Sequence, residues 1–208
     1  MLKIKVCGMT DPGNVKEIAG TAPDLMGFIF YSGSKRYAGK HPDDALFLNV
    51  PSGILKTGVF VNEEASGVVE IVRLFRLDLV QLHGNETVDY CKYMKDKGLS
   101  IIKAFEINER ISFMSLEKYL DVCDYFLFDS KTGSRGGSGL KFDWVKINEY
   151  DLNKPFFLGG GIGPDDACLI KQIKHVSLFG VDINSRFEIR PGIKDAKKVQ
   201  EFINKTKE

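Results

Sequence analysis

The chain has 208 residues, 43% hydrophobic and 27% charged, which is enough for one sizeable core and short for two independent domains. Its 29 basic and 28 acidic side chains leave a formal charge of +1, which argues against a nucleic-acid partner or an acidic membrane surface. No stretch approaches the roughly 18 consecutive apolar residues of a membrane helix, and the first residues do not resemble a signal peptide. We therefore expect a single domain over residues 1–208, cytoplasmic, with neither a membrane nor a nucleic acid as partner.

The cysteines indicate the same compartment. Cys7, Cys91, Cys123 and Cys168 are far apart in the sequence, with no C-x-x-C and no histidine at metal-ligand spacing. This pattern favours reduced thiols in a cytosol over disulfides or a zinc site. No metal is expected.

Eight short runs rich in β-branched and aromatic residues recur at intervals of roughly two dozen residues, each followed by a more helical segment. They are Lys3–Val6, Leu25–Phe30, Leu55–Val61, Leu79–Leu82, Ser100–Phe105, Tyr125–Phe128, Pro155–Leu158 and Leu178–Val181. This alternation predicts an α/β fold, a single (β/α)₈ barrel of eight parallel strands near the lower size limit of that architecture. A doubly wound open sheet is the competing topology.

Helical periodicity is clearest from Val68 to Phe75 and from Ala196 to Ile203, where apolar residues share one face. Pro12 and Pro164 stand at suitable first positions of helices, because a first-turn residue needs no N–H donor. The fifth helix, within Ser112 to Leu120, has the weakest pattern.

Cys7 ends the first predicted strand, directly before a helix. In a barrel the strand ends meet at one face, so this thiol would reach a bound substrate. A lone cysteine is more often a small buried hydrophobic residue. As a thiolate, however, it could act as a general base. Because no histidine or arginine is adjacent in sequence, the cation that favours a thiolate has to come from the fold.

Three other strand ends carry candidate groups. Asp129 ends the sixth strand, and a carboxyl beside apolar surface can hold a proton and act as a general acid, although capping a turn is an equally good explanation. Arg36 follows the second strand and could bind a carboxylate, or be a solvated surface residue. His83 closes the fourth strand, where packing or orienting a neighbour is as good an explanation as catalysis.

The last two strands end in loops that could hold a phosphate. Gly160 and Gly161 follow the seventh strand, and Asn184 and Ser185 follow the eighth. Glycines let backbone N–H groups approach an anion, and the loops after these two strands form the phosphate site in many barrels. A P-loop motif is absent, so NTP hydrolysis is not indicated.

The sequence resembles the phosphoribosylanthranilate isomerase family of tryptophan biosynthesis over essentially its whole length. The pieces that carry the resemblance, in order, are Lys5–Thr10, Gly27–Phe30, Ser34–Tyr37, Gly58–Asn62, Gln81–Gly84, Phe128–Asp129, Gly136–Gly139, Phe142–Trp144, Gly160–Gly161, Gly180–Asp182 and Pro191–Asp195. Single fragments are weak, but this order and spacing are specific.

The resemblance implies an Amadori rearrangement of N-(5-phospho-β-D-ribosyl)anthranilate to 1-(2-carboxyphenylamino)-1-deoxy-D-ribulose 5-phosphate, without cofactor or metal. It implies Asp129 as general acid, Cys7 as general base and Arg36 as ligand of the anthranilate carboxylate. The loops at Gly160–Gly161 and Asn184–Ser185 would hold the phosphate. The loop from Lys131 to Lys141 would close as a lid.

Three positions depart from the family pattern: Arg186 and Gly163 stand where glycine and asparagine are common, and Ser138 where threonine is common. Two other functions stay open. The related isomerase of histidine biosynthesis resembles a two-aspartate design, so Cys7 favours the tryptophan enzyme. A non-catalytic sugar-phosphate-binding barrel would have no need of Cys7 together with Asp129. Whether the protein is a monomer or a homodimer is left undetermined.

Overall fold

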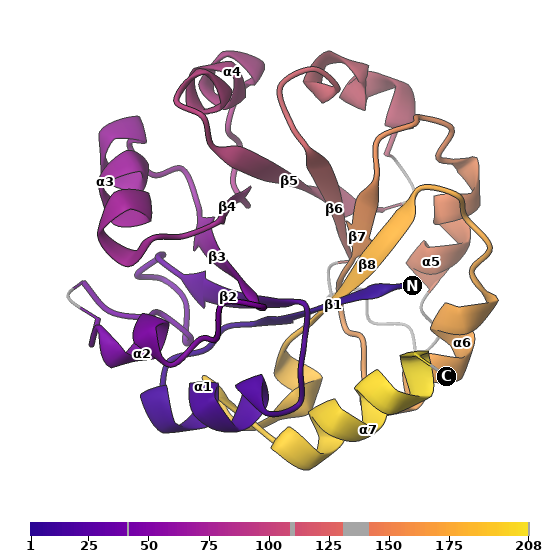
Figure 1. Cartoon of the computed structure of the whole chain (residues 1–208). Helices are drawn as coiled ribbons and strands as arrows, with labels where there is room; N and C mark the ends of the chain where they lie inside the picture. The colour runs from indigo at the N-terminus through magenta and orange to yellow at the C-terminus, as the bar shows by residue number, and fades with distance from the viewer. Residues whose placement is uncertain (41, 109–110, 131–141, 208) are drawn as a thin grey trace.

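The computed structural model describes residues 1–40, 42–108, 111–130 and 142–207, and its centre is a closed ring of eight parallel strands (Figure 1). Each strand pairs with its successor in the chain, and β8 pairs with β1. The strands are β1 (Lys3–Cys7), β2 (Leu25–Ile29), β3 (Leu55–Phe60), β4 (Leu79–Leu82), β5 (Ser100–Ile107), β6 (Tyr125–Ser130), β7 (Phe156–Leu158) and β8 (Leu178–Ile183). The predicted barrel is confirmed, and the open sheet is wrong because the pairing of β8 with β1 leaves no free edge.

Helices surround the barrel on its outside (Figure 1). The α-helices are α1 (Pro12–Ala19), α2 (Ala45–Leu48), α3 (Ala65–Phe75), α4 (Val88–Asp96), α5 (Phe142–Lys146), α6 (Ala167–Gln172) and α7 (Ala196–Lys207). The short 3₁₀ segments are η1 (Phe113–Tyr119), η2 (Ile147–Glu149), η3 (Pro164–Asp166) and η4 (Ser185–Phe187). The weakly patterned fifth helix is η1, a 3₁₀ helix rather than an α-helix.

The helix starts predicted from proline are confirmed. Pro12 begins α1, and the side chain of Asp11 caps that helix by accepting a hydrogen bond from the Asn14 N–H at 2.7 Å. Pro164 begins η3 in the same way, one residue after Gly163. None of the helices in the described ranges is long and apolar enough to span a bilayer.

The strands bury side chains on both faces, because alternate residues point to opposite sides. Ile101 on β5 joins the large core between the strands and the helices, whereas its neighbour Ile102 belongs to a smaller cluster inside the ring. That inner cluster is built from Leu25, Leu79, Ile102, Ala104, Leu127 and Phe157. Apolar residues thus fill the barrel interior, as in other barrels of this kind.

The same alternation decides where buried polar groups point. Gln81 follows Leu79 by two residues on β4, so it faces the interior, and Lys5 shares the face of Cys7 on β1. Lys103 lies between Ile102 and Ala104 on β5 and therefore faces outward, toward the helices. The barrel thus holds two differently placed buried lysines.

A two-stranded hairpin, β9 (Glu188–Arg190) and β10 (Ile193–Lys194), follows β8 and was not predicted. Its strands are too short for a periodic pattern to identify them. The hairpin is fixed to α1, because the Asn14 amide donates to the Lys194 carbonyl at 2.9 Å and accepts from the Lys194 N–H at 2.7 Å. It thereby brings two charged side chains, Glu188 and Lys194, next to Arg36 after β2 and Asn184 after β8.

Candidate active site

A cavity of about 500 Å³ opens at the carboxyl ends of the strands. Seven of the eight predicted site residues line it: Cys7, His83, Asp129, Gly160, Gly161, Asn184 and Ser185. Gln81 and Asp182 join them on the wall. Strand ends far apart in the sequence thus converge on one pocket, as the barrel prediction required.

Cys7 is buried at the floor of this cavity, with 3% of its surface exposed. The chain then turns sharply at Gly8, whose φ of +79° a side chain would strain. The N–H groups of Gly8 and Met9 both donate to the Gly27 carbonyl, at 2.9 and 3.0 Å. The turn that follows the thiol is therefore tied to the end of β2.

Lys5 supplies the cation that the sequence left unassigned. Its side chain is fully buried, its Nζ donates to Asp182 Oδ1 at 2.9 Å, and it makes a side-chain hydrogen bond to Cys7. Burial raises the pKa of the Cys7 thiol, Lys5 acts against that rise, and Asp182 adds to it. The thiol is therefore the resting form, with a buried ammonium beside it.

The ammonium itself stays charged. Burial alone would lower the pKa of Lys5, but the attraction of Asp182, and of Cys7 when it is a thiolate, outweighs it and leaves that pKa above its ordinary value. Burial raises the pKa of Asp182, and Lys5 opposes the rise. The net charge at the cavity floor thus depends on this lysine.

His83 and Asp129 form a second polar unit on the other strands. His83 Nε2 lies 3.2 Å from Asp129 Oδ2, and the Gln81 amide nitrogen lies 2.8 Å from His83 Nδ1. If the amide donates, Nδ1 is the acceptor and the ring proton sits on Nε2, directed at Asp129. His83 is thus placed to orient the predicted acid. The Asp129 side chain is 37% exposed where it lines the cavity.

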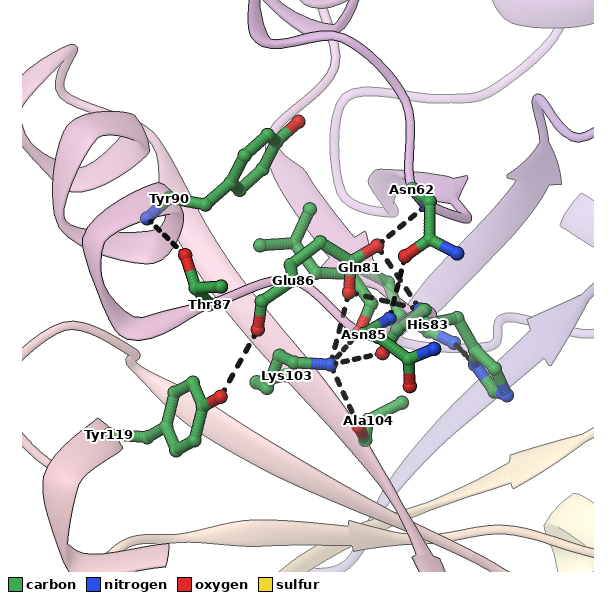
Figure 2. A network of polar contacts seen from close by, with 12 residues as sticks. Asn62, Gln81, His83, Asn85, Glu86, Thr87, Tyr90, Lys103, Ala104 and Tyr119 are labelled. Carbon is green, nitrogen blue, oxygen red and sulfur yellow. Dashed lines mark hydrogen bonds and ion pairs between the residues drawn. The ribbon is translucent and has the colours of Figure 1, made fainter.

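Lys103, on the outer face of β5, holds the loop that follows His83 through hydrogen bonds, as Figure 2 shows. Lys103 Nζ lies 3.1 Å from Glu86 Oε2 and donates to three backbone carbonyls, those of Leu82, Gly84 and Ala104, at 2.8 to 3.2 Å. Glu86 in turn accepts from the N–H groups of Asn62 and Gly84. This outward network fixes the loops after β3 and β4 without touching the cavity.

Arg36 is the predicted site residue that the structure does not bring into the cavity wall. Its Nε and Nη2 donate to the two carboxylate oxygens of Glu188 at 2.7 and 2.6 Å. Lys194 Nζ also donates to Glu188, at 2.6 Å, and to Asn184 Oδ1 at 2.7 Å. Burial would raise the pKa of Glu188, but hydrogen bonds from these two cations hold it below its usual value. Arg36 borders the site all the same, because a Cβ on Gly8 would lie 2.6 Å from its Cδ.

The two loops proposed for phosphate lie together on the cavity wall. Gly160 and Gly161 have φ values of +82° and +66°, which favour glycine, and Asn184 and Ser185 face the same cavity. Two of the departures from the family pattern meet nearby: a Cβ on Gly163 would lie 3.1 Å from Arg186 Cδ. The aliphatic part of Arg186 therefore occupies the space beside Gly163.

Sequence reasoning missed Lys5, Asp182, Gln81, Glu188 and Lys194. For Lys5, Gln81 and Asp182 a signal existed, since each lies two residues before a predicted site residue and so points to the same side of the chain. The predicted lid at residues 131–141, with Ser138, lies outside the described residues. In the described part, no group of three or more His, Cys, Asp or Glu side chains is placed to hold a metal, and the expectation of no metal stays a prediction.

Comparison with known proteins gives one consistent result. The sequence model of the N-(5'-phosphoribosyl)anthranilate (PRA) isomerase family matches residues 4–205. The N-(5'-phosphoribosyl)anthranilate isomerase of Parabacteroides distasonis is 41% identical over 96% of this chain and 91% of its own.

Solved structures agree. The phosphoribosyl anthranilate isomerase of Thermotoga maritima superposes with a TM-score of 0.84 at 32% identity, covering 100% of this chain and 99% of its own. A phosphoribosyl anthranilate isomerase in complex with reduced 1-(o-carboxyphenylamino)-1-deoxyribulose 5-phosphate gives 0.83 at 29% identity, with coverage of 100% and 99%.

Proposed function

The chain belongs to the phosphoribosylanthranilate isomerase family, whose reaction in tryptophan biosynthesis it catalyses, and we propose that Cys7 and Asp129 carry that reaction out. The reaction is the Amadori rearrangement of N-(5-phospho-β-D-ribosyl)anthranilate to 1-(2-carboxyphenylamino)-1-deoxy-D-ribulose 5-phosphate. The observation that carries the assignment of roles is the convergence of Cys7 and Asp129 on one cavity.

Asp129 acts as the general acid. It gives a proton to the ring oxygen of the ribose, the bond from that oxygen to C1 breaks, and the nitrogen lone pair forms the Schiff base. His83 holds Oδ2 of this carboxyl at 3.2 Å, which leaves Oδ1 to face the substrate. His83 is therefore a positioning residue for the acid.

Cys7 acts as the general base. The resting thiol first releases its proton to water in the open cavity; the thiolate then takes the proton from C2, and the electron pair of the C–H bond moves into the Schiff base to give an enolamine. Tautomerisation of the enolamine gives the ketone product. The buried position of Cys7 on the cavity floor supports this step, because a desolvated thiolate is a stronger base than one in water.

The protein binds the substrate at its two ends, the phosphate and the anthranilate carboxylate. The glycine loop at Gly160 and Gly161 and the loop at Asn184 and Ser185 bind the phosphate through backbone N–H groups. Arg36 binds the anthranilate carboxylate. A guanidinium carries five N–H donors, and Glu188 takes two of them while fixing its plane.

The ligand is a small phosphoribosyl anthranilate-type molecule, as in the related complex. We infer a cytoplasmic location, which suits the four free cysteines. The departures Arg186 and Gly163 are compatible with this function, because they fill the same space beside the phosphate loop.

A coupled assay with phosphoribosylanthranilate tests the roles. We expect Cys7→Ala and Asp129→Ala each to lower kcat/KM by at least about 10²-fold, the range of lost acid–base catalysis. The histidine-pathway substrate, run in parallel, measures selectivity. Unchanged turnover in both variants would overturn the mechanism, and binding without turnover in the wild type would favour the sugar-phosphate-binding alternative.

A further inference from the structure

The side chain that sets the charge around Cys7 is Lys5. It lies two residues before the thiol on β1, it is 0% exposed, and its Nζ meets Asp182 Oδ1 at 2.9 Å and the Cys7 thiol. We propose that Lys5 is the positioning residue of Cys7: its buried ammonium orients the thiol and supplies the positive charge against which the thiolate forms. This inference rests on the proposed role of Cys7 as base.

Gly27 shows how closely the two groups are packed. A Cβ added there would lie 2.7 Å from Cys7 Sγ and 3.1 Å from Lys5 Nζ. Both atoms therefore occupy the space directly over Gly27, which any other residue would fill. The glycine on β2 allows the ammonium and the sulfur to come together inside the ring.

The remaining charges near Cys7 do not replace Lys5. Lys194 on β10 and Arg36 after β2 also act on the thiol, but both are hydrogen-bonded to Glu188, whose carboxylate opposes them. Asp182 on β8 raises the pKa of Cys7, after the larger effect of burial. Lys5 is thus the cation that lowers the pKa of Cys7 most, and the negative charge of Asp182 opposes this effect.

This arrangement explains how a buried thiol can serve as a base. Forming the thiolate without a cation would place an unpaired charge in a desolvated site. Beside Lys5 the thiolate is one half of an ion pair, and the ammonium stays protonated while the sulfur gains or loses its proton. The proton taken from C2 then goes to sulfur and not to nitrogen.

The test measures the Cys7 thiol without substrate. The rate of alkylation by iodoacetamide is followed against pH at the Cys7 peptide by mass spectrometry, which separates Cys7 from the exposed Cys168. In Lys5→Met we expect the Cys7 rate at pH 7 to fall roughly tenfold or more, one pKa unit or more. In Asp182→Asn we expect it to rise, because the amide removes the negative charge and keeps an oxygen for Lys5.

Opposite signs in the two variants support the proposal, since a purely structural defect would change both in the same direction. If Lys5→Met does not fold, Asp182→Asn decides alone: a higher rate supports the inference and an unchanged or lower rate overturns it. Lys95→Met is the control: it removes a part-exposed lysine paired with Asp124, neither of which lines the cavity, and it should leave the Cys7 profile unchanged.

The same measurement separates two kinds of failure. An unshifted thiol titration in a folded Lys5→Met overturns the role of Lys5, whatever the turnover. Shifted titrations in an enzyme that does not use phosphoribosylanthranilate would leave Lys5 in place and overturn the proposed role of Cys7 in catalysis.

Discussion

Lys5 and Lys103 are both buried lysines on barrel strands, each paired with a carboxylate, yet they point to opposite faces. Lys103 faces the helices and has four oxygen acceptors within 3.2 Å. Lys5 faces the interior, where Asp182 is its one oxygen partner among the described residues and Cys7 its other contact. An ammonium has three N–H donors, so Lys103 is fully satisfied and Lys5 is not.

The same chemical group thus serves two purposes in this fold. A saturated buried ion pair fixes the loop behind His83 and contributes to rigidity. The Lys5 ammonium, whose N–H donors are not all used, can instead stabilise the negative charge that forms on the neighbouring Cys7. Substitutions at these lysines and at their neighbours test that contrast.

Lys103→Met should be the most destabilising change. It leaves Glu86 buried at 5% exposure without its cation, and breaking a buried pair in this way costs about 3–5 kcal/mol. Urea unfolding followed by circular dichroism measures the loss. Lys95→Met, which removes a half-exposed pair with Asp124, is the control and should cost less than about 1 kcal/mol. Equal losses in the two variants would contradict the saturated-pair interpretation.

Glu188→Gln should destabilise the protein in a pH-dependent way, by about 1.5–3 kcal/mol at neutral pH, the range for hydrogen bonds to charged groups. The pKa of Glu188 is held below its usual value by Arg36 and Lys194 against the effect of burial. A depressed folded-state pKa means that this stabilisation is present above the unfolded-state pKa and is lost as pH falls through the folded-state pKa.

Wild type and Glu188→Gln should therefore differ most near neutrality and converge in acid. Unfolding free energies measured across this range check the convergence. Glu149→Gln, which alters an exposed pair with Lys146, is the control and should follow wild type throughout. A difference that persists in strong acid would show that packing, not charge, makes Glu188 important.

The comparison also shows what the sequence could and could not reveal. Strand–helix alternation predicted the ring, and the ring placed Cys7, His83 and Asp129 at one cavity, because parallel strands share a carboxyl end. Lys5 escaped notice because a lysine two residues from a strand end is usually solvated. In the closed ring, however, the face of β1 that carries Lys5 points into the barrel interior. The partners of Lys5 and Arg36, Asp182 and Glu188, lie more than a hundred residues away, so no local pattern links them.

Lys5→Met should cost less stability than Lys103→Met, about 1–2 kcal/mol, the price of one poorly satisfied polar group. Asp182 lines the cavity and burial already raises its pKa, so without Lys5 it can take up a proton and become neutral. Glu86 has no such access to solvent. Urea unfolding of the two variants side by side gives the ranking, and a larger loss for Lys5→Met would reverse the roles assigned to the two lysines.

Gly27→Ala should cost about 1–2 kcal/mol, within the range for overpacking, because the new methyl group would lie 2.7 Å from Cys7 Sγ and 3.1 Å from the Cys7 Cα, and β1 and β2 must shift slightly to relieve these contacts. Its new methyl group would overlap Cys7 Sγ and push Lys5 Nζ aside. We therefore expect a lower rate of Cys7 alkylation in a protein that still folds. Gly53→Ala, where a Cβ would have no neighbour within 4 Å, is the matched control and should leave the thiol unaffected. An unchanged Cys7 rate in a folded Gly27→Ala would mean that close packing of ammonium and sulfur does not control the thiol.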